Sequence, residues 1–127
     1  MDKFNKVSFI GFGLINSSLA HVFKLKKLAN KTSAFSRRIE TRDKIRSLNI
    51  VDTVNDDIQN SVKDADLIVL GVPVGAMESI INQILPNLKK GVIITDVGSI
   101  KKKLIDTLVP LLPKDVNFIP GHPIAGT

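Results

Sequence analysis

Short apolar runs alternate with amphipathic stretches along this chain. The runs are rich in β-branched side chains and are bounded by glycine, proline or charged residues, which predicts buried strands. Strands are predicted over Val7–Ile10, Thr32–Phe35, Val51–Val54, Asp66–Pro73, Gly91–Asp96 and Val116–Ile119. The run that begins at Asp66 is apolar on both faces, as in the centre of a parallel sheet, whereas Val51–Val54 is short enough for an edge strand.

Apolar residues recur at helical spacing between these runs. The first helix is predicted over Leu14–Leu28, before a turn at Asn30 and Lys31, and the second over Arg38–Leu48. Their apolar faces are predicted from Ile15, Leu19, Val22 and Phe23 in the first helix and from Ile39, Ile45 and Leu48 in the second. The second helix is otherwise rich in charge and is therefore expected on the surface.

Further helices are predicted in the rest of the chain. Asp56 or Asp57 can cap a brief helix that ends at Val62. An almost complete apolar stripe then predicts a helix that packs in the core, formed by Met77, Ile80, Ile81, Ile84, Leu85 and Leu88. The last helix begins at Ile100 and is expected to be stopped by Pro110 and Pro113.

Strands that alternate with helices at this spacing predict βαβ units. The fold class is therefore α/β, a Rossmann-type doubly wound, mainly parallel sheet with helices on both faces. Residues 1–127 are expected to form one domain. Ligands of such a sheet bind at the carboxyl ends of its strands, so the residues that follow each predicted strand are the candidate site.

Glycines follow the first strand. Gly11 would allow a tight turn, Gly13 would let the backbone approach a pyrophosphate, and the helix from Leu14 would direct free N–H groups at that anion. Asn16 replaces the third glycine of the G-x-G-x-x-G pattern, which puts close packing of helix and strand in doubt. Two glycines can also serve a turn alone, but the strand, turn and helix together favour a dinucleotide site.

The second strand leads into Ser36, Arg37 and Arg38. An NAD site usually has a carboxylate here for the ribose 2′-hydroxyl. A hydroxyl and two guanidinium groups suit a 2′-phosphate instead, so the sequence favours NADP over NAD. Two alternatives stay open: Ser36 could cap the next helix while the arginines are solvated, and an arginine of an NAD enzyme can stack on the adenine.

Later strand ends carry further candidates. Val72 and Pro73 bring uncharged backbone to the crevice and suit the ribose–nicotinamide half of a cofactor, although a plain turn explains them equally well. Ser99 is placed to cap the last helix and could also contact substrate or nicotinamide. His122, held between glycine and proline, can accept a proton near neutral pH, whereas His21 is expected to be a surface residue.

Composition narrows the classes of function. The net charge is +6, but the lysines are scattered and no tyrosine, tryptophan or nucleic-acid motif accompanies them, so no nucleic-acid partner is expected. The absence of cysteine excludes disulfides and thiolate metal sites, and no metal is expected. The longest uncharged apolar stretch, Leu67–Met77, is too short to span a bilayer, and no signal peptide precedes the first strand. We therefore expect a cytoplasmic protein with no membrane partner.

Four segments resemble the N-terminal nucleotide-binding domain of the prephenate/arogenate (cyclohexadienyl) dehydrogenase family. They are Gly11–Ile15, Val72–Val74, Thr95–Lys101 and above all Gly121–Thr127, which reads Gly-His-Pro-Ile-Ala-Gly-Thr. The resemblance implies that the cofactor contacts fall on Gly11, Gly13, Leu14 and Ile15 for the pyrophosphate, Ser36 and Arg37 for the adenosine ribose, and Val72 and Pro73 for the nicotinamide. It also implies that Ser99 and His122 contact the ring hydroxyl of the substrate, that His122 assists its deprotonation, and that Thr127 belongs to the substrate site.

The reaction that this resemblance implies is the NAD(P)-dependent oxidative decarboxylation of prephenate (or arogenate) to 4-hydroxyphenylpyruvate (or tyrosine), a step of tyrosine biosynthesis. Family members continue with a helical domain that dimerises and supplies positive groups for the substrate carboxylates. That domain is absent from this chain, which is therefore expected to be the cofactor half of the enzyme, with a homodimer only at full length. Two alternatives stay open: a nucleotide-binding module without catalysis, and another small NAD(P) oxidoreductase of the β-hydroxyacid dehydrogenase or imine reductase type.

Overall fold

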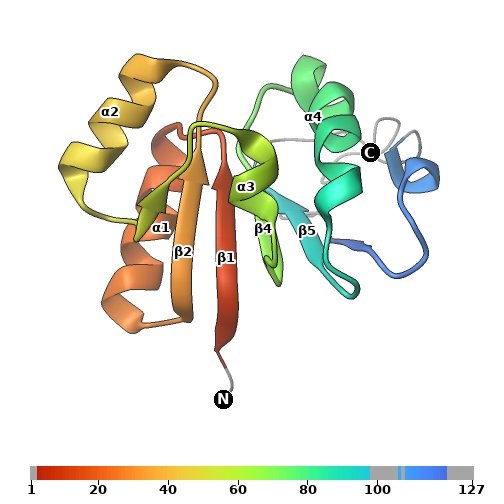
Figure 1. The fold of residues 1–127 in the computed structure, drawn as a ribbon, viewed down its shortest axis with the longest axis horizontal. Helices are drawn as coiled ribbons and strands as arrows, with labels where there is room; N and C mark the ends of the chain where they lie inside the picture. Colours follow the sequence, from red (N-terminus) through yellow and green to blue (C-terminus); the bar gives the residue numbers. More distant parts are fainter. Residues whose placement is uncertain (1–2, 98–105, 107, 120–127) are drawn as a thin grey trace, which may run out of the picture.

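A sheet of six parallel strands forms the centre of the molecule, in the order β3-β2-β1-β4-β5-β6 (Figure 1). The computed structural model describes residues 3–97, 106 and 108–119. The strands are β1 (Phe4–Ile10), β2 (Ala29–Phe35), β3 (Thr53–Val54), β4 (Leu67–Leu70), β5 (Ile93–Asp96) and β6 (Asn117–Ile119). The helices are α1 (Leu14–Lys26), α2 (Ile39–Leu48), α3 (Ile58–Val62) and α4 (Met77–Ile84), with the 3₁₀ turns η1 (Val74–Ala76), η2 (Leu85–Asn87) and η3 (Val109–Leu111).

The strand order confirms the α/β, doubly wound class. From β1 the chain moves outward through β2 and β3, then crosses to β4 on the other side of β1 and moves outward again through β5 and β6. The order therefore reverses between β1 and β4, and a crevice for ligands is expected at the carboxyl ends of these two strands.

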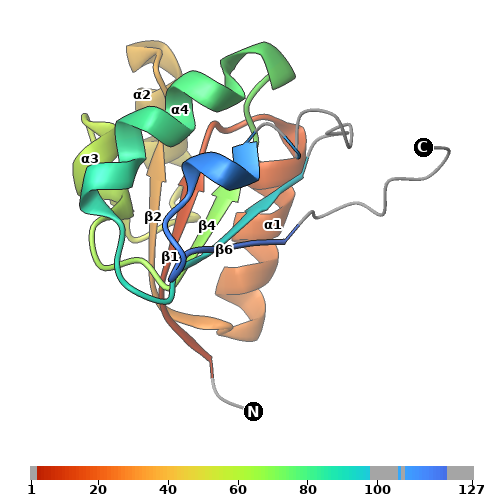
Figure 2. The same cartoon turned by 90° about the vertical axis from the view of Figure 1, so that its right-hand side faces the viewer.

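Two hydrophobic clusters cover the two faces of the sheet. One cluster joins α1 and α2 to the sheet, and the other joins α3 and α4. The residues that β1 and β4 contribute are Val7, Phe9, Leu67 and Val69 to the first cluster and Ile10, Ile68 and Leu70 to the second. Because successive side chains of a strand point to opposite faces, the two pairs of helices lie on opposite faces. Figure 2 shows α1 on one side of the sheet and α3 and α4 on the other.

The end of α1 differs from the prediction. The helix ends at Lys26, not at Leu28, because Lys27 adopts a left-handed conformation with φ 52°. The N–H of Lys27 returns to the carbonyl of Lys24, and the N–H of Leu28 returns to that of Phe23, so the last carbonyls of the helix are satisfied by a tight reversal.

Strand pairing corrects the predicted strand boundaries. β2 begins at Ala29, so Asn30 and Lys31, predicted as a turn, belong to the strand. These polar residues are held by the parallel ladder with β1, in which Lys6 pairs with Lys31, and not by burial. β4 ends at Leu70 and not at Pro73, because its partner β1 ends at the residue opposite Leu70.

Burial corrects the predicted apolar face of α1. Ile15 and Val22 are 51% and 39% exposed, although both were predicted to face the core. Among the α1 residues whose burial is described, Asn16 and Ala20 are fully buried, at 1% and 0% exposure. The helix therefore turns a polar residue toward the sheet, and a pattern read from apolar residues alone cannot detect such a face.

The predictions for the other helices meet different outcomes. In α2 only Ile45 is buried, since Ile39 and Leu48 are 56% and 48% exposed. The stripe of α4 is confirmed as core, with full burial of Met77, Ile81 and Ile84. Asp57 and not Asp56 caps α3, by accepting a hydrogen bond from the N–H of Asn60 at 3.0 Å.

The predicted last helix lies mostly outside the described residues. Asp106 and Leu108 are helical, and Pro110 lies within η3, so this proline changes the type of turn and does not end the helical path at once. Among the helices that the structure describes, none has the length and apolar character needed to cross a membrane.

Candidate functional site

The turn between β1 and α1 lies at the carboxyl end of β1, where the ligand crevice is expected. The N–H of Gly11 donates to the carbonyl of Phe35, at the end of β2, over 2.9 Å. Gly11 has φ +80°, and a Cβ there would lie 2.7 Å from the carbonyl oxygen of Gly71 and 2.8 Å from Cγ1 of Val72. The backbone conformation and the close approach of the segment after β4 both require glycine at this position.

The N-terminus of α1 is suited to an anion. Gly13 occupies the N-cap without a side-chain hydrogen bond, and no acidic residue lies in the first turn. The first amide groups of the helix, from Leu14 and Ile15 onward, have no acceptor within the helix. A Cβ on Gly13 would meet no atom within 4 Å, so the space beside this N-cap residue is open. Free donors, the positive end of a helix dipole and room for close approach are what a pyrophosphate needs.

Asn16 is a site residue whose role the sequence did not reveal. Its side chain is buried, and its Nδ2 donates to the carbonyl of Gly11 over 2.6 Å. A Cβ on Gly71 would lie only 2.6 Å from the same Nδ2, so the glycine that makes room for close packing stands at the end of β4 instead of in α1. The doubt about helix packing is thereby removed. The only signal in the sequence was that Asn16 stands where the G-x-G-x-x-G pattern has its third glycine.

The loop after β2 presents the residues expected at the adenosine ribose. Ser36 is half-buried, and Arg37 and Arg38 are exposed. Neither arginine forms an ion pair within the described residues. Arg42 of α2 holds the loop backbone, because its Nη1 donates to the carbonyls of Ser36 (2.9 Å) and Arg37 (3.2 Å). Both arginines of the loop are thus free to contact an anion.

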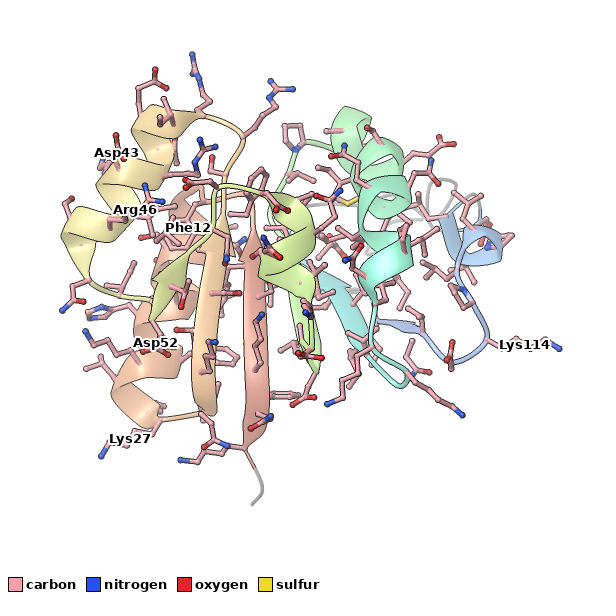
Figure 3. The ribbon with its side chains drawn as sticks, viewed as in Figure 1. Phe12, Lys27, Asp43, Arg46, Asp52 and Lys114 are labelled. Atoms are coloured by element: carbon pink, nitrogen blue, oxygen red, sulfur yellow. The ribbon has the colours of Figure 1, made fainter. Side chains whose placement is uncertain are left out.

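Arg42 is itself fixed by several neighbours. Its Nε lies 3.3 Å from Oδ1 of Asp56, and its guanidinium carbon lies 5.9 Å from the centroid of the Phe35 ring. Arg46, one turn further along α2, also donates to Asp56 and pairs with Asp43 (Figure 3). The hydrogen bond from Arg46 holds the pKa of the Asp56 carboxyl below its ordinary value, so this carboxyl stays charged opposite Arg42. No motif in the sequence pointed to Arg42.

The segment after β4 lies directly against the glycine turn. The N–H of Gly71 donates to the carbonyl of Ile10 over 2.8 Å, which continues the β1–β4 ladder past the last strand residue. Val72 is half-buried beside Gly11, whereas Pro73 is exposed. The structure therefore brings Val72 next to the glycine turn, as expected for two parts of one site.

Two hollows lie beside α1. One, of about 280 Å³, opens toward α2, and Lys44 is the single charged residue in its lining of Phe12, Gly13, Ser17, Thr41, Lys44, Ile45 and Leu48. The other, of about 290 Å³, lies between α1 and the face of β4 and β5, and is lined by Ile15, Leu19, Phe23, Leu67, Val69, Thr95, Asp96 and Val97. Figure 3 shows Phe12 near the carboxyl end of the sheet, far from Lys27 at the other end of α1. Room beside the glycine turn is thus present on the side that faces α2.

The substrate half of the predicted site lies outside the described residues. Ser99, His122 and Thr127 belong to the parts of the chain that the structure does not describe, so their predicted roles stay predictions. In the described ranges, no group of three or more His, Cys, Asp or Glu side chains could hold a metal ion.

Comparison with known proteins gives matches over most or all of the chain. The family model described as "Prephenate dehydrogenase, nucleotide-binding domain" matches residues 19–127. The whole chain is 43% identical to a cyclohexadienyl dehydrogenase of Zymomonas mobilis and covers 43% of that protein. Over 125 residues, 96% of the chain, it is 34% identical to a prephenate dehydrogenase of Lactococcus lactis, of which it covers 34%.

A solved structure gives the same result in three dimensions. The prephenate dehydrogenase from A. aeolicus, crystallised in complex with hydroxyphenyl propionate and NAD+, superposes on 97% of this chain with a TM-score of 0.82 at 28% identity. The chain covers 43% of that structure. It therefore spans less than half the length of each of these three proteins.

Proposed function

Because the chain belongs to the family of prephenate dehydrogenase nucleotide-binding domains, we propose that it is the cofactor-binding part of an enzyme that oxidatively decarboxylates prephenate or arogenate with NAD(P)+. The observation that carries this proposal is the identity of 43% over all 127 residues to a cyclohexadienyl dehydrogenase. The open N-terminus of α1 beside Gly13 supports it independently, because it fits the pyrophosphate of a dinucleotide.

Different described residues would contact different parts of the cofactor. The amides at Gly13, Leu14 and Ile15 would donate to the pyrophosphate, while Gly11 keeps the turn close to β4. Ser36 and Arg37 would contact the adenosine ribose, and Val72 with Pro73 would line the nicotinamide side. Such contacts orient the nicotinamide, which supplies the hydride acceptor when the cofactor is bound.

The chemistry is proposed for residues outside the described ranges. In the reaction the ring carbon that bears the hydroxyl gives up a hydride, the hydroxyl loses its proton, carbon dioxide leaves, and the ring becomes aromatic. We assign removal of that proton to His122, because an imidazole can in general accept a proton near neutral pH, and contact with the hydroxyl to Ser99. Thr127 is assigned to the substrate site with them.

We propose that NADP is preferred over NAD. The support is that the loop after β2 carries two exposed arginines and no carboxylate, and that Arg42 and not Arg37 or Arg38 is engaged with Asp56. A guanidinium binds a 2′-phosphate in a bidentate way, whereas a free 2′-hydroxyl is usually recognised by a carboxylate.

We assign the substrate carboxylates and dimerisation to a helical domain outside these 127 residues, since the relative in Zymomonas mobilis is more than twice as long as the matched region. The full-length protein would then be a homodimer that acts on a small molecule in the cytoplasm.

Two experiments test the proposed function. Equilibrium titration of the chain with NAD+ and NADP+ should give tighter binding of NADP+. Arg37→Ala should weaken NADP+ by about tenfold and leave NAD+ unchanged, as expected for one charge-assisted contact. Lys114→Ala removes an exposed charge far from the loop and serves as the control. Unchanged NADP+ affinity in Arg37→Ala would contradict the cofactor preference.

The second experiment follows prephenate- and arogenate-dependent NAD(P)H formation by the full-length protein. His122→Asn should abolish turnover and barely alter cofactor affinity, because the imidazole acts on the substrate and not on the cofactor. Normal turnover in His122→Asn would refute the assignment of the base. Dinucleotide binding without turnover of either substrate would support the non-catalytic alternative.

A further inference from the structure

The amide of Asn16 reaches backbone groups of three different residues. Nδ2 lies 2.6 Å from the carbonyl oxygen of Gly11, and 3.4 Å from those of both Ile10 and Val69. Since a carbonyl oxygen can only accept a hydrogen bond, these neighbours determine which atom of the amide is the nitrogen. One side chain of α1 thus contacts the end of β1, the glycine turn and β4.

The bond to Gly11 controls the direction of the next amide. In a trans peptide the C=O and the following N–H lie in one plane and point in opposite directions. Because the carbonyl of Gly11 is drawn inward to the buried Asn16, the N–H of Phe12 in the same peptide must point away from Asn16. A glycine at position 16 has no side chain that could fix this peptide.

The segment after β4 is fitted to the same amide. A Cβ built on Gly71 would lie 2.6 Å from Nδ2, 2.8 Å from Cγ and 3.3 Å from Oδ1 of Asn16, and no other atom lies as close. Gly71 does not have a positive φ, in contrast to Gly11. Its need for glycine therefore comes from the side chain of Asn16 and not from its own backbone.

We infer that Asn16 is a positioning residue for the cofactor: its amide fixes the Gly11–Phe12 peptide so that the turn presents its N–H groups to the dinucleotide, and Gly71 is the glycine that makes this possible. The inference rests on the proposed binding of NAD(P)+. In the usual arrangement the third glycine of the pattern lies in the helix. Here the helix carries the hydrogen-bonding side chain of Asn16, and the glycine, Gly71, lies at the end of the opposing strand β4.

The test measures dinucleotide affinity and melting temperature in Asn16→Ala, Gly71→Ala and the double variant. Asn16→Ala removes the amide but keeps a residue that favours helix. Its dissociation constant for the preferred dinucleotide should rise by about tenfold at 25 °C, the loss expected for one short hydrogen bond that organises the turn. A purely structural role would lower the melting temperature and leave the affinity of the folded protein unchanged.

Gly71→Ala should lower the melting temperature by about 5 °C, because its methyl group cannot fit beside Asn16. In the Asn16→Ala background the same change should have little effect, because the colliding atoms are gone. Gly75→Ala is the matched control, since a Cβ there would meet nothing within 4 Å, and it should leave both measurements unchanged.

Each outcome bears on one claim. Normal affinity in Asn16→Ala, or equal damage from Gly71→Ala in both backgrounds, would overturn the inference while the proposed function stands. A wild-type chain that binds neither NAD+ nor NADP+ would refute the proposed function, and the inference with it.

Discussion

Replacing Arg42 by alanine should loosen the loop that carries Ser36 and Arg37. The guanidinium of Arg42 donates to both loop carbonyls, and its side chain is only 13% exposed. Removing it leaves the half-buried carbonyl of Ser36 without its donor and uncovers the ring of Phe35.

The contacts of Arg42 set the size of the effect. A hydrogen bond from a charged donor to a partly buried carbonyl contributes about 1.5 kcal/mol. The bond to the carbonyl of Arg37 is exposed, and Asp56 is 74% exposed, so these two contacts and the aromatic one together add less than about 1 kcal/mol. Arg42→Ala should therefore lower the free energy of unfolding by about 2 kcal/mol, which for a domain of this length lowers the melting temperature by about 7 °C.

Urea unfolding and thermal melting measure this loss, and titration with NADP+ measures its consequence for the loop. For the stability measurements Arg38→Ala is the control, because Arg38 is exposed and has no ion pair within the described residues. For the NADP+ titration the control is Lys114→Ala, because Arg38 belongs to the proposed binding loop. Arg42→Lys should recover only part of the stability, since an ammonium cannot reproduce a planar fork that reaches two carbonyls and a carboxylate. Equal stability of Arg42→Ala and Arg38→Ala would show that the loop does not depend on this guanidinium, and the reasoning would be refuted.

Three further predictions concern the fold around the site. The hydrogen bond from Lys89 and those from two backbone amides lower the pKa of the Asp66 carboxyl. The ionised carboxyl therefore stabilises the fold above its ordinary pKa of about 4, and this stabilisation is lost as pH falls through the lowered pKa. Asp66→Asn should reduce the dependence of the free energy of unfolding on pH, measured with urea between pH 6 and pH 2. Ser61→Ala should lower the free energy of unfolding by about 1 to 2 kcal/mol, because the Oγ of Ser8, 0% exposed, would lose its partner at 2.8 Å, and adding Ser8→Ala should cost little more in a double-mutant cycle. Gly11→Ala should give a protein that melts at least about 10 °C lower or fails to fold, because φ is +80° and a Cβ would lie 2.7 Å from a carbonyl oxygen of the neighbouring strand end; near-normal melting by circular dichroism would contradict the geometry of the turn.

Features that depend on local order were predictable from the sequence. The alternation of apolar runs and amphipathic stretches predicted the α/β class, and the burial of the α4 stripe follows from helical spacing alone. Gly11 was recognised because a strand, a turn and a helix follow one another directly. Even so, Asn30 and Lys31 were misread as a turn, since nothing in their own side chains indicates that a partner strand will hold them.

Features that depend on distant segments were not predictable. The position of Asn16 is meaningful only once β4, 53 residues away, places the carbonyl of Val69 beside it. Arg42 holds the loop after β2 because α2 folds back so that its guanidinium reaches the carbonyls of Ser36 and Arg37. The sequence shows only a charged residue in a surface helix, which does not indicate these contacts. Ser99 and His122 stay predictions because they lie outside the described residues.

The position of β1 in the sheet has a consequence for synthesis of the protein. Val7 pairs with Thr32 on one side and with Leu67 on the other. At about 5 to 20 residues per second, a ribosome needs about 3 to 12 s to add the ~60 residues that separate β1 from β4. Throughout that interval the strand at the middle of the future sheet has at least one free edge, and its side chains Phe9 and Ile10 are not yet buried as they are in the finished sheet. The nascent chain is thus most open to pairing with other chains before its fourth strand emerges.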